Sequence, residues 1–346
     1  MNTQPHDPQI DFVPSYLLQQ RALTRAQAPL VSCVIPAYNE GSNIVPMLRA
    51  LHRLLSQHGY RHHLIVVDDG SSDDTIERVM TEATSLPLTL IQLSRNFGKE
   101  LALTAGIDHA DGDVAVLIDA DFQHPPEMVP EFLLQWKNGY DMVYGIRADR
   151  VDETPFKRWS TRMFYKLLNL GAHQPIPENT QDFRVLDRCI VEALRAMPER
   201  NRFMKGLYSW VGFTRLGVVT RTDSRREGQS SFNAWRLLRL AATGLTAFSN
   251  VPLRIWTLVG GVVSMSAIVY ALYIILDTMI NGNPERGWPT IVVGVMFLGG
   301  VQLLSIGILG EYMGRIYDEV KRRPSYFVSR KVTMAAKVDL FDDAKP

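Results

Sequence analysis

Two carboxylates stand one residue apart in the segment 119–123, which reads Asp-Ala-Asp-Phe-Gln. The apolar run before them, Val114–Ile118, has the length and composition of a buried strand in a parallel sheet. Open α/β sheets bind ligands beyond the carboxyl ends of such strands. Paired acids there can hold Mg²⁺ or Mn²⁺ through oxygen ligands, and the cation would neutralise a diphosphate. We therefore predict a metal site at Asp121, with Asp119 and Gln123 assisting. The alternative is an ordinary polar turn.

Three further polar clusters follow predicted strands nearer the amino terminus, at residues 36–40, 68–71 and 96–99. Parallel neighbouring strands would bring all of these clusters to one edge of the sheet. Carboxylates there can hold a base and a ribose by hydrogen bonds, and Lys99 can meet a phosphate as a point charge. Each cluster taken alone is ordinary loop chemistry, but their recurrence at successive strand ends predicts a nucleotide site.

Alternating strands and helices must position these clusters. Apolar runs predict strands at 30–36, 64–67, 88–93, 114–118 and 141–145. Helical spacing covers 43–57, a segment from Asp73, and 100–110. This alternation predicts an α/β fold with a doubly wound, mostly parallel sheet. A dinucleotide-binding domain would need G-x-G-x-x-G in the first turn, which instead reads Pro-Ala-Tyr-Asn-Glu, and the sequence has no P-loop.

Composition narrows the class of protein. The 346 residues allow one large domain or two modest ones. A formal net charge of +1 is too small to attract nucleic acid non-specifically, so we expect no nucleic-acid partner. Two cysteines provide no disulfide framework. The polar residues 1–25 predict no signal peptide, and we expect a loosely ordered lead-in with a short helix near 15–25.

Three motifs resemble those of the inverting family-2 glycosyltransferases with the GT-A fold. They are Pro-Ala-Tyr-Asn-Glu at 36–40, Val-Asp-Asp-Gly-Ser at 67–71 and Asp-Ala-Asp-Phe-Gln-His-Pro at 119–125. Arg-Asn-Phe-Gly-Lys at 95–99 narrows the resemblance to enzymes that glycosylate a polyisoprenyl phosphate. These include bactoprenol glucosyltransferases, dolichyl-phosphate mannose synthases and aminoarabinose transferases. The resemblance covers the chain between residues 30 and 330.

The resemblance implies a nucleotide-sugar donor. Residues 224–231 match the family's Arg-x-Gly-x-Ser element through Arg226, Gly228 and Ser230. A loop that closes over a diphosphate needs such donors and a glycine hinge, whereas the alternative is a solvated linker. We expect the donor to contact Pro36, Tyr38, Glu40, Asp69, Lys99, Asp119, Arg226 and Ser230.

Cations beyond the fifth strand are candidates for the acceptor phosphate. Arg147 follows the strand at 141–145, and Arg158 and Arg162 share one face of a helix predicted over 156–170. The arginine fork suits a phosphate oxyanion. The alternative is that these arginines form a solvated helix face.

Asp182 lies in a polar stretch, 180–184, which predicts a loop. In the resembling family the aspartate of this motif is the proposed general base, so Asp182 and Asp121 are the candidate catalytic residues. A helix cap or an ion pair with Arg184 is an equal alternative. An acceptor phosphate is mostly ionised near neutrality because its second pKa is about 6, so Asp182 is expected chiefly to orient the nucleophile.

Two uncharged apolar segments, 256–276 and 289–309, are each long enough to cross a hydrocarbon core of about 30 Å. Basic residues flank this pair at Arg236, Arg239, Arg254, Arg315, Lys321, Arg322 and Arg323. The charge bias predicts a multi-pass protein of the inner (cytoplasmic) membrane, with the catalytic domain and both termini cytoplasmic. The alternative is a pair of buried core helices.

The resulting domain plan has five parts. They are a lead-in over 1–28, a catalytic domain over 29–231, an amphipathic juxtamembrane helix over 232–254, a transmembrane hairpin over 255–311 and a cytoplasmic tail over 312–346, polar and loose from 331.

We expect metal-dependent, inverting transfer of a hexose from a nucleotide sugar to undecaprenyl phosphate at the membrane, by an enzyme that the resemblance suggests is a homo-oligomer. UDP-glucose is favoured because residues 96–100 and 177–180 look closest to the bactoprenol glucosyltransferases. A GDP-mannose-dependent synthase and an aminoarabinose transferase stay open. A processive polysaccharide synthase is disfavoured because the sequence lacks a Gln-x-x-Arg-Trp motif and further spans. A non-enzymatic scaffold would leave the acidic strand ends without a purpose.

Overall fold

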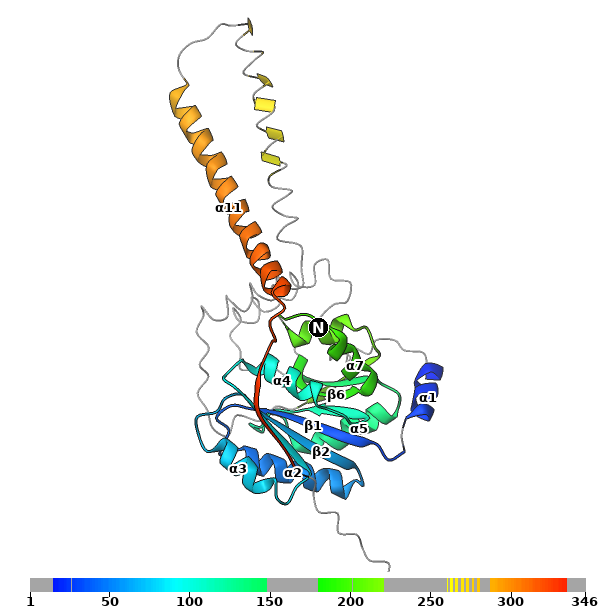
Figure 1. Ribbon diagram of the computed structural model, residues 1–346. Coiled ribbons are helices and arrows are strands. Elements are labelled where there is room, and N and C mark those ends of the chain that lie inside the picture. Colours follow the sequence, from blue (N-terminus) through cyan, green and yellow to red (C-terminus); the bar gives the residue numbers. More distant parts are fainter. Residues whose placement is uncertain are drawn as a thin grey trace, which may run out of the picture. The chain divides into compact units, whose positions relative to one another are not determined.

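The computed structural model describes residues 15–25, 27–147, 180–200, 202–220 and 287–334, with single residues and pairs between 260 and 280. The chain divides into two compact units (Figure 1). The first contains the described residues of 15–147, 180–220 and 324–334, and the second contains those between 260 and 323. The polar clusters all belong to the first unit.

The described helices and strands follow the predicted alternation over the first half of the chain. The helices are α1 (Ser15–Thr24), α2 (Ile44–Gln57), α3 (Thr75–Glu82), α4 (Lys99–Asp108), α5 (Val129–Lys137), α7 (Arg188–Ala196), α8 (Met204–Trp210) and α11 (Trp288–Val320). The strands are β1 (Leu30–Ala37), β2 (Arg61–Asp68), β3 (Leu88–Leu93), β4 (Val114–Leu117), β5 (Met142–Arg147), β6 (Thr180–Asp187), β7 (Arg215–Thr220) and β8 (Val328–Met334). The five predicted strands and the helix near 15–25 are confirmed.

The strands form one sheet in the order β7-β5-β6-β4-β1-β2-β3-β8. The central strands β4, β1, β2 and β3 are parallel, as predicted. β6 runs antiparallel to both of its neighbours, and β8 runs antiparallel to β3. The sheet is therefore mixed, and the prediction of a mostly parallel sheet holds only for its centre.

Helices cover both faces of the sheet, with α2 and α3 on one side and α4 and α7 on the other (Figure 1). α2 buries residues at helical spacing against the sheet: Ile44, Met47, Leu48, Leu51 and Leu55. On the opposite face α4 approaches β1 closely at Gly106, where an added Cβ would lie 2.1 Å from Val34 Cγ1. This close contact sets the distance between the second half of α4 and the middle of β1.

The segment 180–184, predicted as a polar loop, is the beginning of strand β6. Phe183 and Val185 are fully buried on one face, and Asp182 and Arg184 alternate with them on the other. β6 pairs with β4 on one side and β5 on the other. The loop prediction was wrong because the polar side chains alternate with buried apolar ones along a strand that pairs on both sides. Asp182 consequently lies on a backbone that pairs on both sides.

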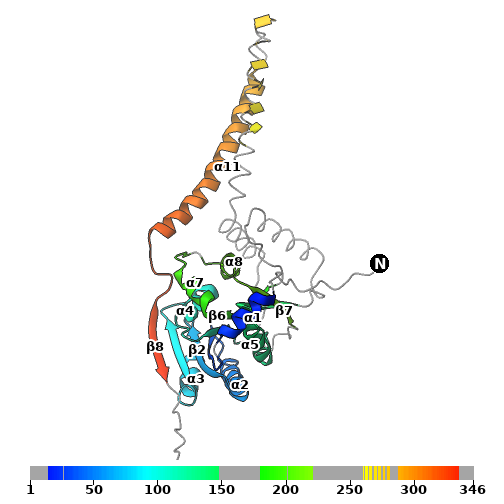
Figure 2. The same ribbon diagram turned by 90° about the vertical axis from the view of Figure 1, so that its right-hand side faces the viewer.

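β8 corrects the prediction of a loose tail from residue 331. Figure 2 shows this strand at the edge of the sheet, and it pairs with β3 from Val328 to Met334. The Thr89 hydroxyl donates to the Thr333 hydroxyl at 3.0 Å, and the Tyr326 hydroxyl donates to Asp108 Oδ2 at 2.8 Å. Because most side chains of β8 are exposed, its sequence carries no hydrophobic alternation, and the strand was missed.

α1 is docked on the first unit rather than loose. The Arg25 guanidinium donates to Asp141 Oδ1 at 3.1 Å and lies 4.7 Å from the centre of the Trp136 ring. Arg21 also pairs with Asp141. Gly139 has a φ of 107°, and an added Cβ there would lie 2.3 Å from the Leu18 carbonyl oxygen. The helix therefore braces the turn that leads into β5.

Candidate active site

Four side chains of alternating charge meet at the edge of the sheet. Lys99 Nζ donates to Asp119 Oδ2 at 2.8 Å and to Asp182 Oδ2 at 2.7 Å. Lys205 Nζ lies 3.7 Å from the other oxygen of Asp182, Oδ1. We call Asp119, Lys99, Asp182 and Lys205, in this order of contact, the charge row. Its members come from the end of β4, the first residue of α4, β6 and α8.

Hydrogen bonds link all four predicted polar clusters into one set. Ser71 Oγ accepts from the Asn39 amide nitrogen at 2.9 Å, which joins the first cluster to the second. Asp69 accepts from the amide nitrogens of Phe97 and Gly98 at 2.7 and 2.8 Å, which joins the second to the third. The contact between Lys99 and Asp119 joins the third to the fourth. The prediction that these clusters share one edge of the sheet is confirmed.

Asp69 positions the loop that precedes Lys99. Its side chain is buried, and both carboxylate oxygens accept backbone N–H groups of that loop. The neighbouring Gly70 has a φ of 74°, and an added Cβ would lie 2.7 Å from the backbone of Arg95 and Asn96. The two loops therefore pack backbone to backbone. The predicted role of Asp69 in nucleoside binding stays a prediction, and the structure adds this positioning role.

We expect Asp69→Ala to lower the free energy of unfolding by about 1–3 kcal/mol, because two partly buried N–H groups would lose their acceptor. Thermal unfolding of the purified protein in detergent measures the change. Asp74→Ala is a matched control, since Asp74 is exposed and pairs only with Arg78 among the described ion pairs. Equal unfolding midpoints for the two variants would contradict this role of Asp69.

The charges of the row stabilise one another. Burial favours neutral Lys99, but Asp119 and Asp182 outweigh it and hold the pKa of Lys99 well above its usual value. Burial likewise favours neutral Asp182, but Lys99 and then Lys205 outweigh it and hold the pKa of Asp182 well below its usual value. At neutral pH Asp182 is therefore a carboxylate. Because it is ion-paired, it is a weak proton acceptor.

The chain turns sharply after Asp121, the second acid of the predicted metal site. Phe122 has a φ of 58°, a conformation that is uncommon for a bulky residue and that occurs in sharp turns and at strained functional sites. Asp121 Oδ1 accepts from the Gln123 amide nitrogen at 3.0 Å. The next residue, His124, is buried and stacks on Phe183 with ring centres 5.8 Å apart. Its Nδ1 has no hydrogen-bond partner among the described residues.

The side chains of Asp119 and Asp121 are suited to binding a hard divalent cation. No group of three or more His, Cys, Asp or Glu side chains is arranged for metal binding within the described part of the chain. Mg²⁺, however, is usually bound by one or two carboxylates together with substrate phosphates and waters. Asp119 and Asp121, one residue apart beyond β4, supply that donor set.

The other predicted donor contacts lie on the first cluster. Pro36 is in β1, and Tyr38 just beyond it is 48% exposed. Glu40 Oε2 accepts from Asn43 Nδ2 at 2.9 Å, so this carboxylate is oriented by the start of α2. Tyr38 and Glu40 therefore follow the carboxyl end of a central strand, as predicted for a nucleotide site.

Comparison of the sequence with known proteins shows the family to which the chain belongs. The model of the family described as glycosyl transferase family 2 matches residues 32–195. The bactoprenol glucosyl transferase of Shigella phage SfII is 43% identical over 301 residues, which cover 87% of this chain and 97% of that protein. The chain belongs to glycosyl transferase family 2.

Two further relatives of this family-2 glycosyltransferase span nearly as much of it. The prophage bactoprenol glucosyl transferase homolog of Escherichia coli (strain K12) is 43% identical over 87% of this chain and 98% of its own length. An uncharacterised glycosyltransferase of Synechocystis sp. is 43% identical over 86% of this chain and 94% of its own length. The relatives therefore match the glycosyltransferase across both of its units.

Sequence reasoning missed Lys205, which the structure adds to the candidate site of this glycosyltransferase through its ion pair with Asp182. Its position on α8 is set by Glu100 Oε2, which accepts from the Met204 amide nitrogen at 2.8 Å. Lys205 Nζ donates to the Thr180 carbonyl oxygen at 3.0 Å. The sequence around it, Arg-Phe-Met-Lys-Gly, contains no acid or glycine cluster that would have drawn attention. Lys205 is recognised only through its contacts with Thr180 and Asp182 of β6, which form because α8 lies over that strand in the folded protein.

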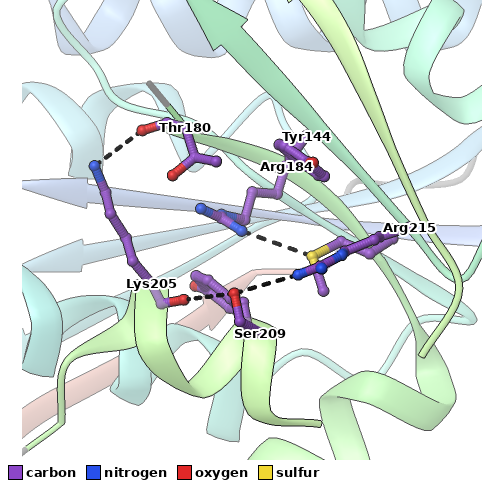
Figure 3. Close-up of a pocket in the computed structure, with 8 residues that line it drawn as sticks. Tyr144, Thr180, Arg184, Lys205, Ser209 and Arg215 are labelled. Carbon is purple, nitrogen blue, oxygen red and sulfur yellow. Dashed lines mark hydrogen bonds between the residues drawn. The ribbon is translucent and has the colours of Figure 1, made fainter. Parts of the chain in front are cut away.

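A small pocket lies between α8 and the face of β6 that carries Asp182 (Figure 3). Its volume is about 10 Å³, roughly the space of one water molecule. Arg184 is buried there, with its guanidinium 4.0 Å from the centre of the Tyr208 ring and its Nη2 donating to the Gln181 carbonyl oxygen at 3.0 Å. The alternative that Asp182 pairs with Arg184 is therefore not observed, because Asp182 pairs with Lys99 instead.

Several predicted residues of the glycosyltransferase lie outside the described residues. They are Arg158, Arg162, Arg226 and Ser230. Arg147 is the last residue of β5, and its side chain is not described. β5 pairs with β6, and Tyr144 is the register partner of Arg184. The backbone of Arg147 is therefore on the strand next to the one that carries Asp182.

Proposed function

We propose that this glycosyltransferase transfers a hexose from a nucleotide sugar to the phosphate of a polyprenyl phosphate. UDP-glucose and undecaprenyl phosphate are the favoured donor and acceptor. The observation that carries the proposal is the 43% identity to bactoprenol glucosyl transferases over nearly their full length. The charge row supports it because transfer between two phosphate groups requires cations and oriented acids at one site.

In the proposed reaction an acceptor phosphate oxygen attacks the anomeric carbon of the sugar. A new oxygen–carbon bond forms, and the bond from that carbon to the donor diphosphate breaks with its electron pair leaving on the diphosphate. The attack inverts the anomeric carbon because nucleophile and leaving group occupy opposite faces. No proton need be removed from an ionised phosphate, whose second pKa is about 6. Asp182 accordingly orients the acceptor rather than deprotonating it.

Asp119 and Asp121, assisted by Gln123, would hold Mg²⁺ or Mn²⁺. When bound, such a cation stabilises the charge that develops on a leaving diphosphate. Lys99 supplies a fixed positive charge beside Asp119 at 2.8 Å. We propose that Tyr38, Glu40 and Asp69 bind the nucleoside of the donor. We also propose that Arg226 and Ser230 contact the diphosphate of the donor. Arg147, Arg158 and Arg162 remain our candidates for the acceptor phosphate.

A transfer assay tests the proposed function. Purified enzyme is incubated with polyprenyl phosphate and radiolabelled UDP-glucose, GDP-mannose or UDP-aminoarabinose, with Mg²⁺, with Mn²⁺ or with a chelator. We expect label in the lipid fraction with UDP-glucose, and its loss with the chelator. Labelling of the lipid from GDP-mannose alone would show that the donor is GDP-mannose and not UDP-glucose. Absence of lipid labelling with all three donors would contradict the proposal.

A membrane hairpin would bring this site to its lipid acceptor. Within the described residues, one helix stretch, Phe297–Val320, is long and apolar enough to cross a membrane. It lies in α11, whose exposed apolar side chains include Ile291, Val295, Phe297, Leu303 and Leu309. The predicted span 289–309 falls inside α11, while most of 256–276 and all of 232–254 lie outside the described residues. We propose that both spans cross the inner membrane and that the catalytic domain is cytoplasmic.

The proposed topology predicts which sites an impermeant thiol reagent reaches from outside intact cells. We expect labelling of a cysteine introduced at Asn283, in the short loop between the spans, and no labelling at Asp342. Both variants would carry Cys189→Ser to reduce the background. Permeabilised cells provide the control, since both sites should then react. Labelling of Asp342→Cys but not Asn283→Cys in intact cells would reverse the topology.

A further inference from the structure

Lys205 lies at the end of the charge row opposite Asp119. The contacts run from Asp119 through Lys99 and Asp182 to Lys205. In an inverting displacement the nucleophile and the leaving group occupy opposite faces of the reacting carbon. If the leaving diphosphate lies at the Asp119 end, the anionic acceptor needs a cation at the other end.

The Lys205 ammonium has hydrogen-bonding capacity for a ligand. An ammonium carries three N–H donors. Among the described residues, its only hydrogen-bond acceptor is the Thr180 carbonyl oxygen at 3.0 Å, because the 3.7 Å distance to Asp182 Oδ1 is too long. The Lys205 side chain is 27% exposed, so solvent or a ligand reaches it.

Two contacts set the position of Lys205. Glu100 accepts from the Met204 amide nitrogen at 2.8 Å and so fixes the start of α8. The Thr180 carbonyl oxygen holds the ammonium, as Figure 3 shows. The neighbouring pocket adds Arg184 and Arg215, and no carboxylate is among its described lining residues. These cations would attract an anion beside Lys205, and the Asp182 carboxylate, 3.7 Å from Lys205 Nζ, offsets part of that attraction.

We propose that Lys205 binds the phosphate of the lipid acceptor and holds the attacking oxygen beside Asp182. This inference rests on the proposed function and adds a residue to the acceptor site. A lysine suits this task because it meets a phosphate as a point charge that tolerates movement of the headgroup. Asp182 then lies beside that ammonium, 3.7 Å from it, while the Thr180 carbonyl oxygen holds the ammonium in place.

Binding of a short-chain polyprenyl phosphate to the full-length enzyme in detergent tests the proposal without requiring turnover. Calorimetry in the presence of UDP would compare wild type with Lys205→Gln, Lys205→Arg and Lys137→Gln. We expect Lys205→Gln to weaken lipid binding by about tenfold to a hundredfold, the loss of one charge-assisted hydrogen bond. Lys205→Arg should retain most of the affinity. Lys137 packs over the Tyr60 ring at 4.5 Å, so Lys137→Gln should bind like wild type.

Steady-state kinetics provide the second measurement. Lys205→Gln should raise the KM for the lipid by a similar factor and leave the KM for the nucleotide sugar unchanged. A wild-type enzyme that binds the lipid but transfers no sugar would contradict the proposed function, while weaker binding by Lys205→Gln would still support the inference. Unchanged lipid affinity in Lys205→Gln, a loss of UDP affinity instead, or no lipid binding by wild type would overturn it. An unchanged thermal midpoint confirms that the variant is folded.

Discussion

Replacing Asp121 with asparagine should lower the turnover number by about a hundredfold or more, the size of effect seen when a group that stabilises transition-state charge is removed. The variant removes one carboxylate of the proposed metal site and keeps the shape of the side chain. Its fold should survive, because an asparagine oxygen can still accept from the Gln123 amide nitrogen, as Asp121 Oδ1 does at 3.0 Å. Turnover is measured by lipid labelling at saturating donor and acceptor, and thermal unfolding verifies the fold.

Asp111→Asn is a matched control for Asp121→Asn. Asp111 is an acid near the start of β4, its side chain is 83% exposed, and it pairs with Arg195 at 3.4 Å. It should lose no activity, since exposed pairs contribute little. Raising Mg²⁺ or Mn²⁺ should partly restore Asp121→Asn if the loss is one of cation affinity. Near-normal turnover of Asp121→Asn with either cation supplied would remove Asp121 from the metal site.

The central half of the fold was predictable because its strands are buried on both faces. A run such as Val114–Ile118 reads as continuous apolar residues, and the helices between such runs have their own spacing. β6 and β8 escaped prediction for opposite reasons. In β6, Asp182 pairs with Lys99 of the charge row and Arg184 lines the neighbouring pocket, whereas β8 is an edge strand with mostly exposed side chains. Neither strand has the hydrophobic pattern from which strands are predicted.

The candidate site was predictable where charged or polar residues directly follow an apolar strand in the sequence. Lys99 follows β3 and Asp119 follows β4, and the parallel pairing of the central strands puts both strand ends at the same edge of the sheet. Because β1 and β2 lie between these strands, the 2.8 Å contact itself was not predictable. The contact between Asp182 and Lys99 joins residues 83 positions apart and depends on the antiparallel insertion of β6 beside β4. Lys205 depends in addition on the placement of α8 by Glu100. Such contacts are tertiary, and no local spacing encodes them.

Lys99→Met should lower the turnover number by about a hundredfold to a thousandfold, the range typical for loss of a preorganised charge in an active site. Lys99 is the shared partner of Asp119 and Asp182, at 2.8 and 2.7 Å. Its removal leaves two carboxylates facing one another without the charge between them. The methionine keeps the length of the side chain, so the effect on packing is small. Arg188 is half-buried, pairs with Glu192 on α7 and donates to the Ala110 carbonyl oxygen at 2.9 Å, so Arg188→Gln is a control for loss of a paired charge outside the charge row and should leave the turnover number unchanged.

A double-mutant cycle tests whether Lys99 and Asp182 are coupled through their ion pair or contribute to turnover independently. Asp182→Asn alone should reduce turnover with both substrates still binding, because the oriented carboxylate is lost. Residues in contact are coupled, so Lys99→Met combined with Asp182→Asn should cost less than the sum of the single effects. The reason is that Asp182→Asn removes one of the two repelling carboxylates that Lys99→Met leaves unpaired. Strictly additive losses would show that Lys99 and Asp182 act separately, and the charge row would then not function as a unit.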